Sequence, residues 1–165
     1  NVMPDILTIA KGIASGLPLG ACLSTKSIMD QWTTGSHGGT YGGNPITCAA
    51  GIATLDVVSS VLPSVETLGS IAMDKLQSGI GQLPMVGEIR GHGLMIGIEF
   101  IDANGDSNPK AVKEIIAHCL DHNLIILACG KDGNVIRLMP PLTISKVDLN
   151  AGLDVLIKAC LHVLS

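Results

Sequence analysis

The sequence predicts an α/β fold, and three patterns support this prediction. The first is the apolar run from Asp5 to Ala10, which contains β-branched residues and is typical of a strand covered on both faces of a sheet. The second is the pair Asn44-Pro45 and its repeat Asn108-Pro109, each of which supplies an N-cap and a first helical residue. The third is the alternation of apolar residues from Leu94 to Phe100, which predicts a half-buried strand.

The composition is that of a folded polypeptide that could form one domain. Hydrophobic residues make up 47% of the 165 residues and charged residues 15%, which argues against disorder. The net charge of -4, with no basic run, argues against nucleic acid or an anionic membrane as a partner. The few aromatic residues argue against a base-stacking surface for single-stranded nucleic acid. No uninterrupted apolar run reaches the roughly 20 residues that a membrane span needs.

The cysteines contain no C-x-x-C pair and are odd in number. We interpret them as reduced core residues of an intracellular protein, which argues against a disulfide or zinc framework. We therefore expect a cytoplasmic location, or a mitochondrial one if the organism is a eukaryote. The five residues are Cys22, Cys48, Cys119, Cys129 and Cys160.

The N-terminal half alternates strands, glycine-rich turns and helices. Glycines and prolines after the first strand predict turns and a second short strand from Leu19 to Ser24, with Lys11 between the two strands. A short helix is expected from Ser27 to Trp32, followed by a polar, glycine-rich loop over 33–43. The helix that begins at Pro45 should end at Pro63, because proline cannot donate to the carbonyl four residues back.

A second helix is expected after Pro63. The glycines at 79–81 would end it, and its apolar face would contain Leu68, Ile71, Ala72 and Leu76. We place a domain boundary just beyond this helix, with residues 1–83 in one domain and residues 84–165 in a smaller one.

The C-terminal half begins with a period-two strand from Glu88 onwards. A turn-rich loop over 102–108 leads to the helix at Pro109, and two strands are expected over 124–127 and 135–139. Ser145 marks the start of the last helix. The buried stripes would be Val112, Ile115, Ile116, Cys119 and Leu120 in the first helix, and Leu149, Leu153, Leu156, Ile157, Cys160 and Leu164 in the last.

Lys11 is the candidate for covalent catalysis. It follows an apolar strand and precedes Gly12, so buried neighbours would fix its stem where the strand ends. A lysine placed in this way can lose its proton and attack a carbonyl, as a Schiff-base lysine does. The spacing alone is more typical of a lysine whose stem covers apolar surface while its head lies in solvent.

The loop over 33–43 is a candidate anion site. Its glycines free backbone N–H groups, Thr40 adds a hydroxyl beside Gly39, and a helix begins nearby at Asn44-Pro45, all of which favour a phosphate. A glycine-rich loop before a helix is more often a plain turn, which is the alternative. The loop is not a P-loop, since no Gly-Lys-Ser/Thr follows.

Arg137 is the candidate for binding a substrate carboxylate. It interrupts an apolar run, where a guanidinium is costly without an anion and its planar fork suits a carboxylate. The sequence alone favours the alternative of a structural ion pair. His118 and His122 lack an evident third ligand, so we interpret them as surface or partly buried residues and expect no metal site. The glycines over 90–97 lack dinucleotide-binding spacing.

Three separated motifs resemble the class III aminotransferases, which use pyridoxal phosphate. They are the segments 4–12, 16–21 and 37–45. The resemblance implies that the chain is the C-terminal part of a fold-type I pyridoxal-phosphate-dependent transferase, comprising the end of the large α/β domain and the small α/β domain. It implies that Lys11 carries the cofactor pyridoxal 5'-phosphate. It also implies that Thr40, beside Gly39, binds the cofactor phosphate of the neighbouring subunit in a homodimer.

A fourth segment, Gly130 to Leu142, resembles the corresponding stretch of 4-aminobutyrate aminotransferases, in which this arginine, Arg137 here, binds a substrate carboxylate. Its core, residues 134–137, also occurs in acetylornithine enzymes. The implied reaction transfers an amino group from an ω-amino acid such as 4-aminobutyrate to 2-oxoglutarate. Activities on acetylornithine, ornithine, alanine with glyoxylate, or a diamine remain alternatives.

The resemblance also places further cofactor contacts upstream of Lys11. In the family, the acidic partner of the pyridine nitrogen and the ring-stacking aromatic residue precede the lysine. We therefore expect this fragment to be inactive alone, as the C-terminal part of a longer polypeptide. The non-enzyme alternative is a truncated, non-catalytic remnant.

Overall fold

The computed structural model describes residues 2–164. It divides into two compact units, of which the first ends at Ser60 and the second begins at Val61. Helix α2, Pro45–Ile80, contributes to both units. The predicted boundary between residues 83 and 84 concerns the domains of the whole protein, and it stays a prediction.

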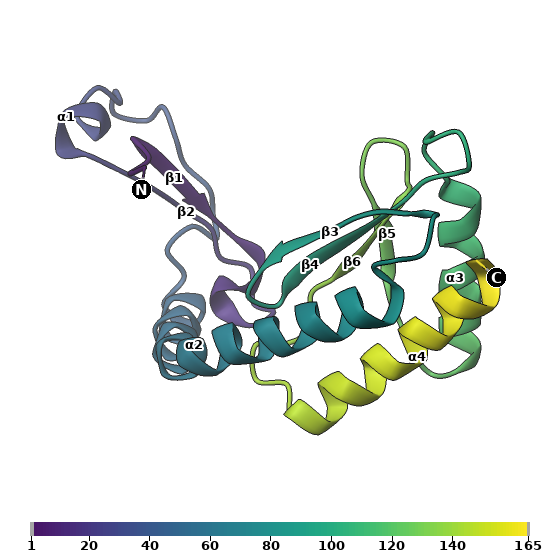
Figure 1. Ribbon diagram of the computed structural model, residues 1–165. Coiled ribbons are helices and arrows are strands. Elements are labelled where there is room, and N and C mark those ends of the chain that lie inside the picture. Colours follow the sequence, from purple (N-terminus) through teal and green to yellow (C-terminus); the bar gives the residue numbers. More distant parts are fainter. Residues whose placement is uncertain (1, 165) are drawn as a thin grey trace. The chain divides into compact units, whose positions relative to one another are not determined.

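The first unit contains a two-stranded antiparallel sheet (Figure 1). Strand β1 (Ile6–Ile9) pairs with β2 (Ala21–Ser24), the short 3-10 helix η1 (Lys11–Ala14) lies in their connection, and α1 (Lys26–Met29) follows β2. The prediction that the first strand is covered on both faces is wrong within this chain, because Ile6 is 56% and Leu7 48% exposed. Within residues 2–164, β2 is the sole sheet partner of β1.

Helix α2 begins at Pro45 as predicted, with the Asn44 side chain as its cap. The prediction that Pro63 interrupts the helix is wrong, because Pro63 lies inside α2. Proline removes the N–H that would bond to the carbonyl of Ser59. Both residues are exposed, so water can take that bond and the helix continues.

Within residues 2–164, α2 is the one helix long and apolar enough to cross a membrane, a result that rests on length and composition alone. The expectation from the sequence concerned uninterrupted apolar runs, and within α2 the apolar run is interrupted by Asp56 and Glu66. Most residues of its apolar window are exposed within this chain.

The second unit is a four-stranded antiparallel sheet in the order β3-β4-β6-β5. Its strands are β3 (Val86–His92), β4 (Met95–Phe100), β5 (Leu127–Cys129) and β6 (Val135–Leu138). Helices α3 (Pro109–Asp121) and α4 (Lys146–Leu164) complete the unit. In Figure 1, α4 and the C-terminal half of α2 run along one face of this sheet.

The core of the second unit lies between the sheet and these helices. The predicted alternation in β4 is confirmed, because Ile96 is 2% exposed and Ile98 and Phe100 are 0% exposed, whereas Met95 is 60% exposed. Burying each such large apolar side chain contributes about 1.5–3 kcal/mol. The helices add fully buried residues to the same core, among them Leu76, Val112, Ile115, Cys119, Leu156 and Cys160.

The predicted helix starts at Pro109 and after Ser145 are confirmed. Asn108 Oδ1 accepts from the Ala111 N–H at 3.1 Å, and the Ser145 hydroxyl accepts from the Asp148 N–H at 3.0 Å. The buried stripe of α3 is confirmed at Val112, Ile115 and Cys119, but it is wrong at Leu120, which is 59% exposed.

Two strand predictions in the second unit need correction. The period-two segment is a hairpin of two strands, in which His92 pairs with Met95. Gly93 lies in the two-residue turn between them, and its φ of +54° favours glycine. The strand predicted over 124–127 lies later, at Leu127–Cys129, after Asn123 adopts a left-handed conformation with φ +61°.

Candidate active site

Lys11 lies at the end of β1, as predicted, and is the first residue of η1. Its φ is +57°, a left-handed conformation that costs a residue other than glycine about 1–3 kcal/mol. The side chain is exposed and forms no hydrogen bond or ion pair with any residue in the range 2–164. Its amine is therefore available to a ligand.

The turn that carries Lys11 is fixed against the first half of α2. The hydroxyls of Ser15 and Thr54 are 2.9 Å apart, which ties the end of η1 to the helix. Gly51 is buried there, and a Cβ at this position would lie 2.8 Å from Leu19 Cδ2. A small residue in α2 thus allows the loop after Lys11 to pack closely on the helix.

The glycine-rich loop over 33–43 is exposed throughout. The backbone N–H groups of Gly38, Gly39 and Thr40 have no partner in the described part of the chain, and the Thr40 hydroxyl also forms no bond there. A Cβ at Gly38 or Gly39 would meet nothing within 4 Å. These glycines are thus not required by packing within the chain, and the open space would admit a phosphate.

The start of α2 contributes less to this anion site than the sequence predicts. Asn44 Oδ1 accepts from the N–H groups of Ile46 and Thr47, at 2.9 and 3.4 Å, and Cys48 N–H donates to Asn44 O at 2.9 Å. Pro45 has no N–H. The first helical donors are therefore already paired, and only the loop N–H groups and the Thr40 hydroxyl remain for a ligand.

Arg137 lies in β6 of the second unit, directly opposite Gly97 of β4 and Leu127 of β5. Its side chain forms no ion pair or hydrogen bond with any residue that the structure describes. The predicted alternative of a structural ion pair is therefore wrong for the described residues. The guanidinium remains partly exposed and available to an anion.

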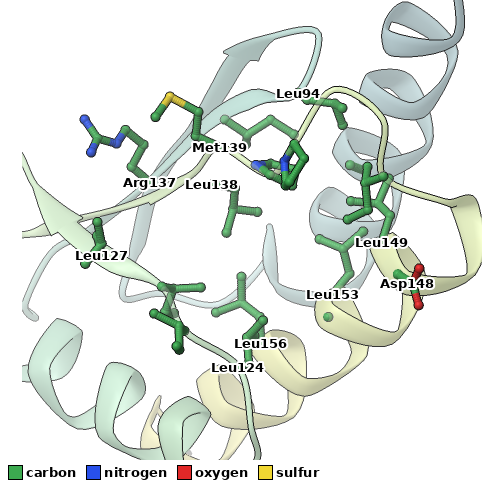
Figure 2. A pocket seen from close by; sticks show the side chains of 18 residues that line it. Leu94, Leu124, Leu127, Arg137, Leu138, Met139, Asp148, Leu149, Leu153 and Leu156 are labelled. Atoms are coloured by element: carbon green, nitrogen blue, oxygen red, sulfur yellow. The ribbon is translucent and has the colours of Figure 1, made fainter. Parts of the chain in front are cut away.

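A mainly aliphatic cavity of about 380 Å³ adjoins Arg137. Figure 2 shows Leu138, Leu153 and Leu156 lining its interior, whereas the Arg137 guanidinium points away from them beside Met139. The charged lining residues are Arg137 and Asp148. The cavity can therefore accept apolar surface, and the cationic head of Arg137 lies outside the aliphatic interior.

A second arginine on the same sheet is fully engaged. Arg90 Nη1 donates to Glu88 Oε2 at 2.7 Å and to Glu99 Oε2 at 2.6 Å. The hydrogen bonds from Glu99 first, and then Glu88, raise the pKa of Arg90 above its ordinary value. This cluster was not predicted from the sequence, although the opposite charges of Glu88 and Arg90, two residues apart on one strand, could have indicated it.

Three of the five histidines, His118, His122 and His162, form a ring cluster near the C-terminal ends of α3 and α4. The rings of His118 and His122 stack with their centroids 4.4 Å apart, and His162 lies 4.9 Å from His118. His118 is partly buried and His122 exposed, as interpreted from the sequence. Residues 2–164 contain no group of three or more histidine, cysteine or acidic side chains placed to hold a metal.

The predicted site residues divide between the two units. Lys11, Gly39 and Thr40 belong to the first unit, and Arg137 belongs to the second. The glycines over 90–97 lie in the β3–β4 hairpin with no helix after the turn, which confirms that they are not a dinucleotide-binding motif.

Comparison with known proteins gives the same family throughout the chain. A family model described as aminotransferase class-III matches residues 1–160. The 4-aminobutyrate aminotransferase of Escherichia coli is 38% identical over 160 residues, which are 94% of this chain and 38% of that protein. The acetylornithine aminotransferase of Aquifex aeolicus is 35% identical over 156 residues, 94% of this chain and 38% of that protein.

Solved structures agree with this result. A Bacillus anthracis aminotransferase matches with a TM-score of 0.87 and 30% identity, covering 98% of this chain and 40% of its own. The ornithine aminotransferase of Toxoplasma gondii, described with partial occupancy of PLP at its active site, has a TM-score of 0.85 and 29% identity, covering 97% of this chain and 37% of its own. The chain thus spans less than half the length of these relatives. The predicted fold class is confirmed, and the chain belongs to the class III aminotransferases.

Proposed function

We propose that this chain holds pyridoxal 5'-phosphate through Lys11, as part of an aminotransferase that transfers the amino group of an ω-amino acid such as 4-aminobutyrate to 2-oxoglutarate. The observation that carries the proposal is the exposed, unpaired Lys11 at the strand end in a family of aminotransferases. When bound, the cofactor supplies an electron-withdrawing ring that stabilises negative charge on the substrate carbon.

The residues of this chain fit the cofactor in two respects. The amine of Lys11 has no competing carboxylate in the range 2–164, so it can bond to an aldehyde carbon. The N–H groups of Gly38, Gly39 and Thr40, with the Thr40 hydroxyl, offer unpaired donors to a phosphate. We assign Thr40 to the phosphate bound by the neighbouring subunit, which makes a homodimer part of the proposal.

Lys11 also has a role in proton transfer. Once a substrate amine displaces it, its own amine is free to accept the proton from the substrate carbon and to return it to a different atom. The β1–β2 pair and the Ser15–Thr54 contact hold its backbone, so that the side chain alone needs to move.

Arg137 would bind the substrate carboxylate through its planar fork. It lies on a strand and not on a flexible loop, so the backbone from which the guanidinium extends is fixed within the second unit. The similarity to the 4-aminobutyrate aminotransferase of Escherichia coli supports an ω-amino acid as the donor. The second candidate is an acetylornithine aminotransferase, which the similarity to the Aquifex aeolicus enzyme favours.

Amine-donor profiling tests the proposal. The protein, expressed from its complete open reading frame, is assayed with 2-oxoglutarate and with 4-aminobutyrate, ornithine or acetylornithine as donor. We expect the highest kcat/KM for 4-aminobutyrate and no turnover in Lys11→Ala. A preference for acetylornithine would select the second candidate, and full activity in Lys11→Ala would contradict the role of Lys11.

A further inference from the structure

The open face of the second unit's sheet carries one row of residues from four strands. Arg90, Gly97, Arg137 and Leu127 are successive cross-strand partners on β3, β4, β6 and β5. Directly opposed residues share a face of the sheet. Because Ile96 and Ile98 point into the core, this row lies on the opposite face, away from the helices.

Gly97 leaves the space between the two arginines without a side chain. A Cβ at this position would make only ordinary contacts, 3.5 Å from Val135 Cγ1 and 3.9 Å from the Arg90 carbonyl oxygen. Packing therefore does not require glycine here. The two arginines face each other across an open position of the sheet.

Glu99 is the acidic residue that can reach both arginines. It is paired with Glu88 on one side and with Val135 on the other, so Arg90 and Arg137 are its two diagonal neighbours. Diagonal neighbours lie roughly 7–8 Å apart, within reach of long side chains. Glu99 bonds to Arg90 at 2.6 Å, and Arg137 has no partner within residues 2–164.

We propose that Arg90 is a positioning residue that holds Glu99 away from Arg137 and thereby keeps the Arg137 guanidinium free to bind a carboxylate. Glu88 strengthens this arrangement, because it adds a second bond to the same Arg90 nitrogen. That the bound carboxylate belongs to the substrate rests on the proposed function. That Arg90 holds Glu99 away from Arg137 is independent of the proposed function.

Stability does not account for the cluster. The side chains of Arg90, Glu88 and Glu99 are 47%, 60% and 34% exposed, and exposed ion pairs add little to the stability of a protein. If Arg90 is lost, Arg137 becomes the sole cation among the diagonal neighbours of Glu99. Glu99 then competes with an incoming carboxylate for the same guanidinium.

A structural experiment tests the positioning independently of activity. Crystal structures of the protein expressed from its complete open reading frame, with and without Arg90→Gln, are compared at Glu99, together with the ¹⁵N NMR signal of Arg137 Nε. We expect Glu99 to pair with Arg137 in the variant only. A Glu99 that remains away from Arg137, with an unchanged Arg137 signal, would overturn the proposal.

Kinetics test the consequence for the substrate. In Arg90→Gln we expect KM for 4-aminobutyrate to rise about fivefold with little change in kcat, which corresponds to competition from an exposed ion pair of roughly 1 kcal/mol. The double variant Arg90→Gln, Glu99→Gln should regain the original KM, and Arg90→Lys should largely retain it. Glu114→Gln, which removes an exposed carboxylate from a different ion pair on α3, is the matched control and should leave KM unchanged.

The outcomes separate the two proposals. A raised KM that the double variant does not correct would contradict the role of Glu99. A Glu99–Arg137 pair in the variant structure, in a protein without aminotransferase activity, would support the positioning by Arg90 and contradict the proposed function.

Discussion

Lys11 and Arg137 are both cations without a partner among residues 2–164. For Lys11, the left-handed φ of +57° adds a conformational cost, and such costs are concentrated where function requires them. For Arg137, the strand context fixes the backbone while the guanidinium stays accessible. In our account, both cations are left unpaired for ligands.

Replacing Arg137 with Lys should separate binding from stability. The charge is kept, but the planar fork is lost, so we expect KM for 4-aminobutyrate to rise about tenfold. The free energy of unfolding should change by no more than about 0.5 kcal/mol, because no ion pair is broken. Steady-state kinetics and urea denaturation measure the two quantities. Lys131→Gln, in the preceding loop, is the control, and unchanged kinetics in Arg137→Lys would reassign Arg137 to a structural role.

Among the helices and strands, the helix starts could be predicted because they depend on neighbouring residues. The predictions that were wrong concern features that depend on residues far away in the sequence or on solvent. The caps at Asn44, Asn108 and Ser145 depend on residues within one turn, so the sequence contains the necessary information. The continuation through Pro63 depends on water reaching the Ser59 carbonyl, and the exposure of β1 depends on which elements lie beside it. Neither can be read from a short window.

In the candidate site too, residues in local motifs could be predicted, whereas contacts that depend on strand pairing could not. Lys11, Thr40 and Arg137 lie in local motifs, so the sequence could single them out. The Arg90–Glu99 contact depends on the pairing of β3 with β4, and the position of Gly97 beside Arg137 depends on the pairing of β4 with β6. Because the segment from Glu88 to Phe100 was predicted as one strand, the contacts between its two halves, β3 and β4, could not be predicted.

Pro63 gives a direct test of the continuous helix. Pro63→Ala restores a backbone N–H that could bond to the Ser59 carbonyl, so we expect the free energy of unfolding to increase by about 1–3 kcal/mol. Ser64→Ala, at the exposed neighbouring position, is the control and should have a smaller effect. Both are measured by urea denaturation. A less stable Pro63→Ala protein would argue against an unbroken α2.

The packing of α3 on α4 predicts a loss of stability at alkaline pH. Burial raises the pKa of Cys119 from 9.0 to about 11 and that of Cys160 to about 12. Above about pH 9 the unfolded chain loses thiol protons that the folded chain keeps, so the free energy of unfolding falls as the pH rises towards 11. Urea denaturation between pH 8 and pH 10.5 should show this fall, with a smaller slope in Cys160→Ala. An equal slope would contradict the assignment to Cys160.

The prediction that the cysteines are core residues is only partly correct. Cys119 and Cys160 are core residues as predicted, whereas Cys22, in β2, is exposed and contradicts the expectation. Burial of a cysteine depends on which faces of a strand are covered. Composition alone does not reveal this.

On the scale of the whole molecule, the first unit exposes much apolar surface. Tyr41, Ile46 and Ile52 are 80%, 72% and 65% exposed. The chain spans 34% to 38% of the length of the 4-aminobutyrate aminotransferases that it resembles. Such surfaces mark places where further protein packs. The proposed homodimer, in which Thr40 serves the neighbouring subunit, gives this region a partner.

Mixed dimers test that assignment. Lys11→Ala and Thr40→Val should each abolish most activity alone. In a dimer of one subunit of each kind, one site would combine an intact Lys11 with an intact Thr40 from the other subunit. Random mixing should therefore restore about a quarter of the activity. No recovery in hybrids shown to form would place Thr40 in the site of its own subunit.

The proposed function depends on a covalent bond between Lys11 and the cofactor, and borohydride reduction makes that bond permanent so that it can be located. The protein, expressed from its complete open reading frame, is loaded with pyridoxal 5'-phosphate, reduced, digested and analysed by peptide mass mapping, with Lys11→Arg treated in parallel. We predict a single phosphopyridoxyl adduct on Lys11 that is lost in Lys11→Arg. An adduct on another lysine, or none, would contradict the account.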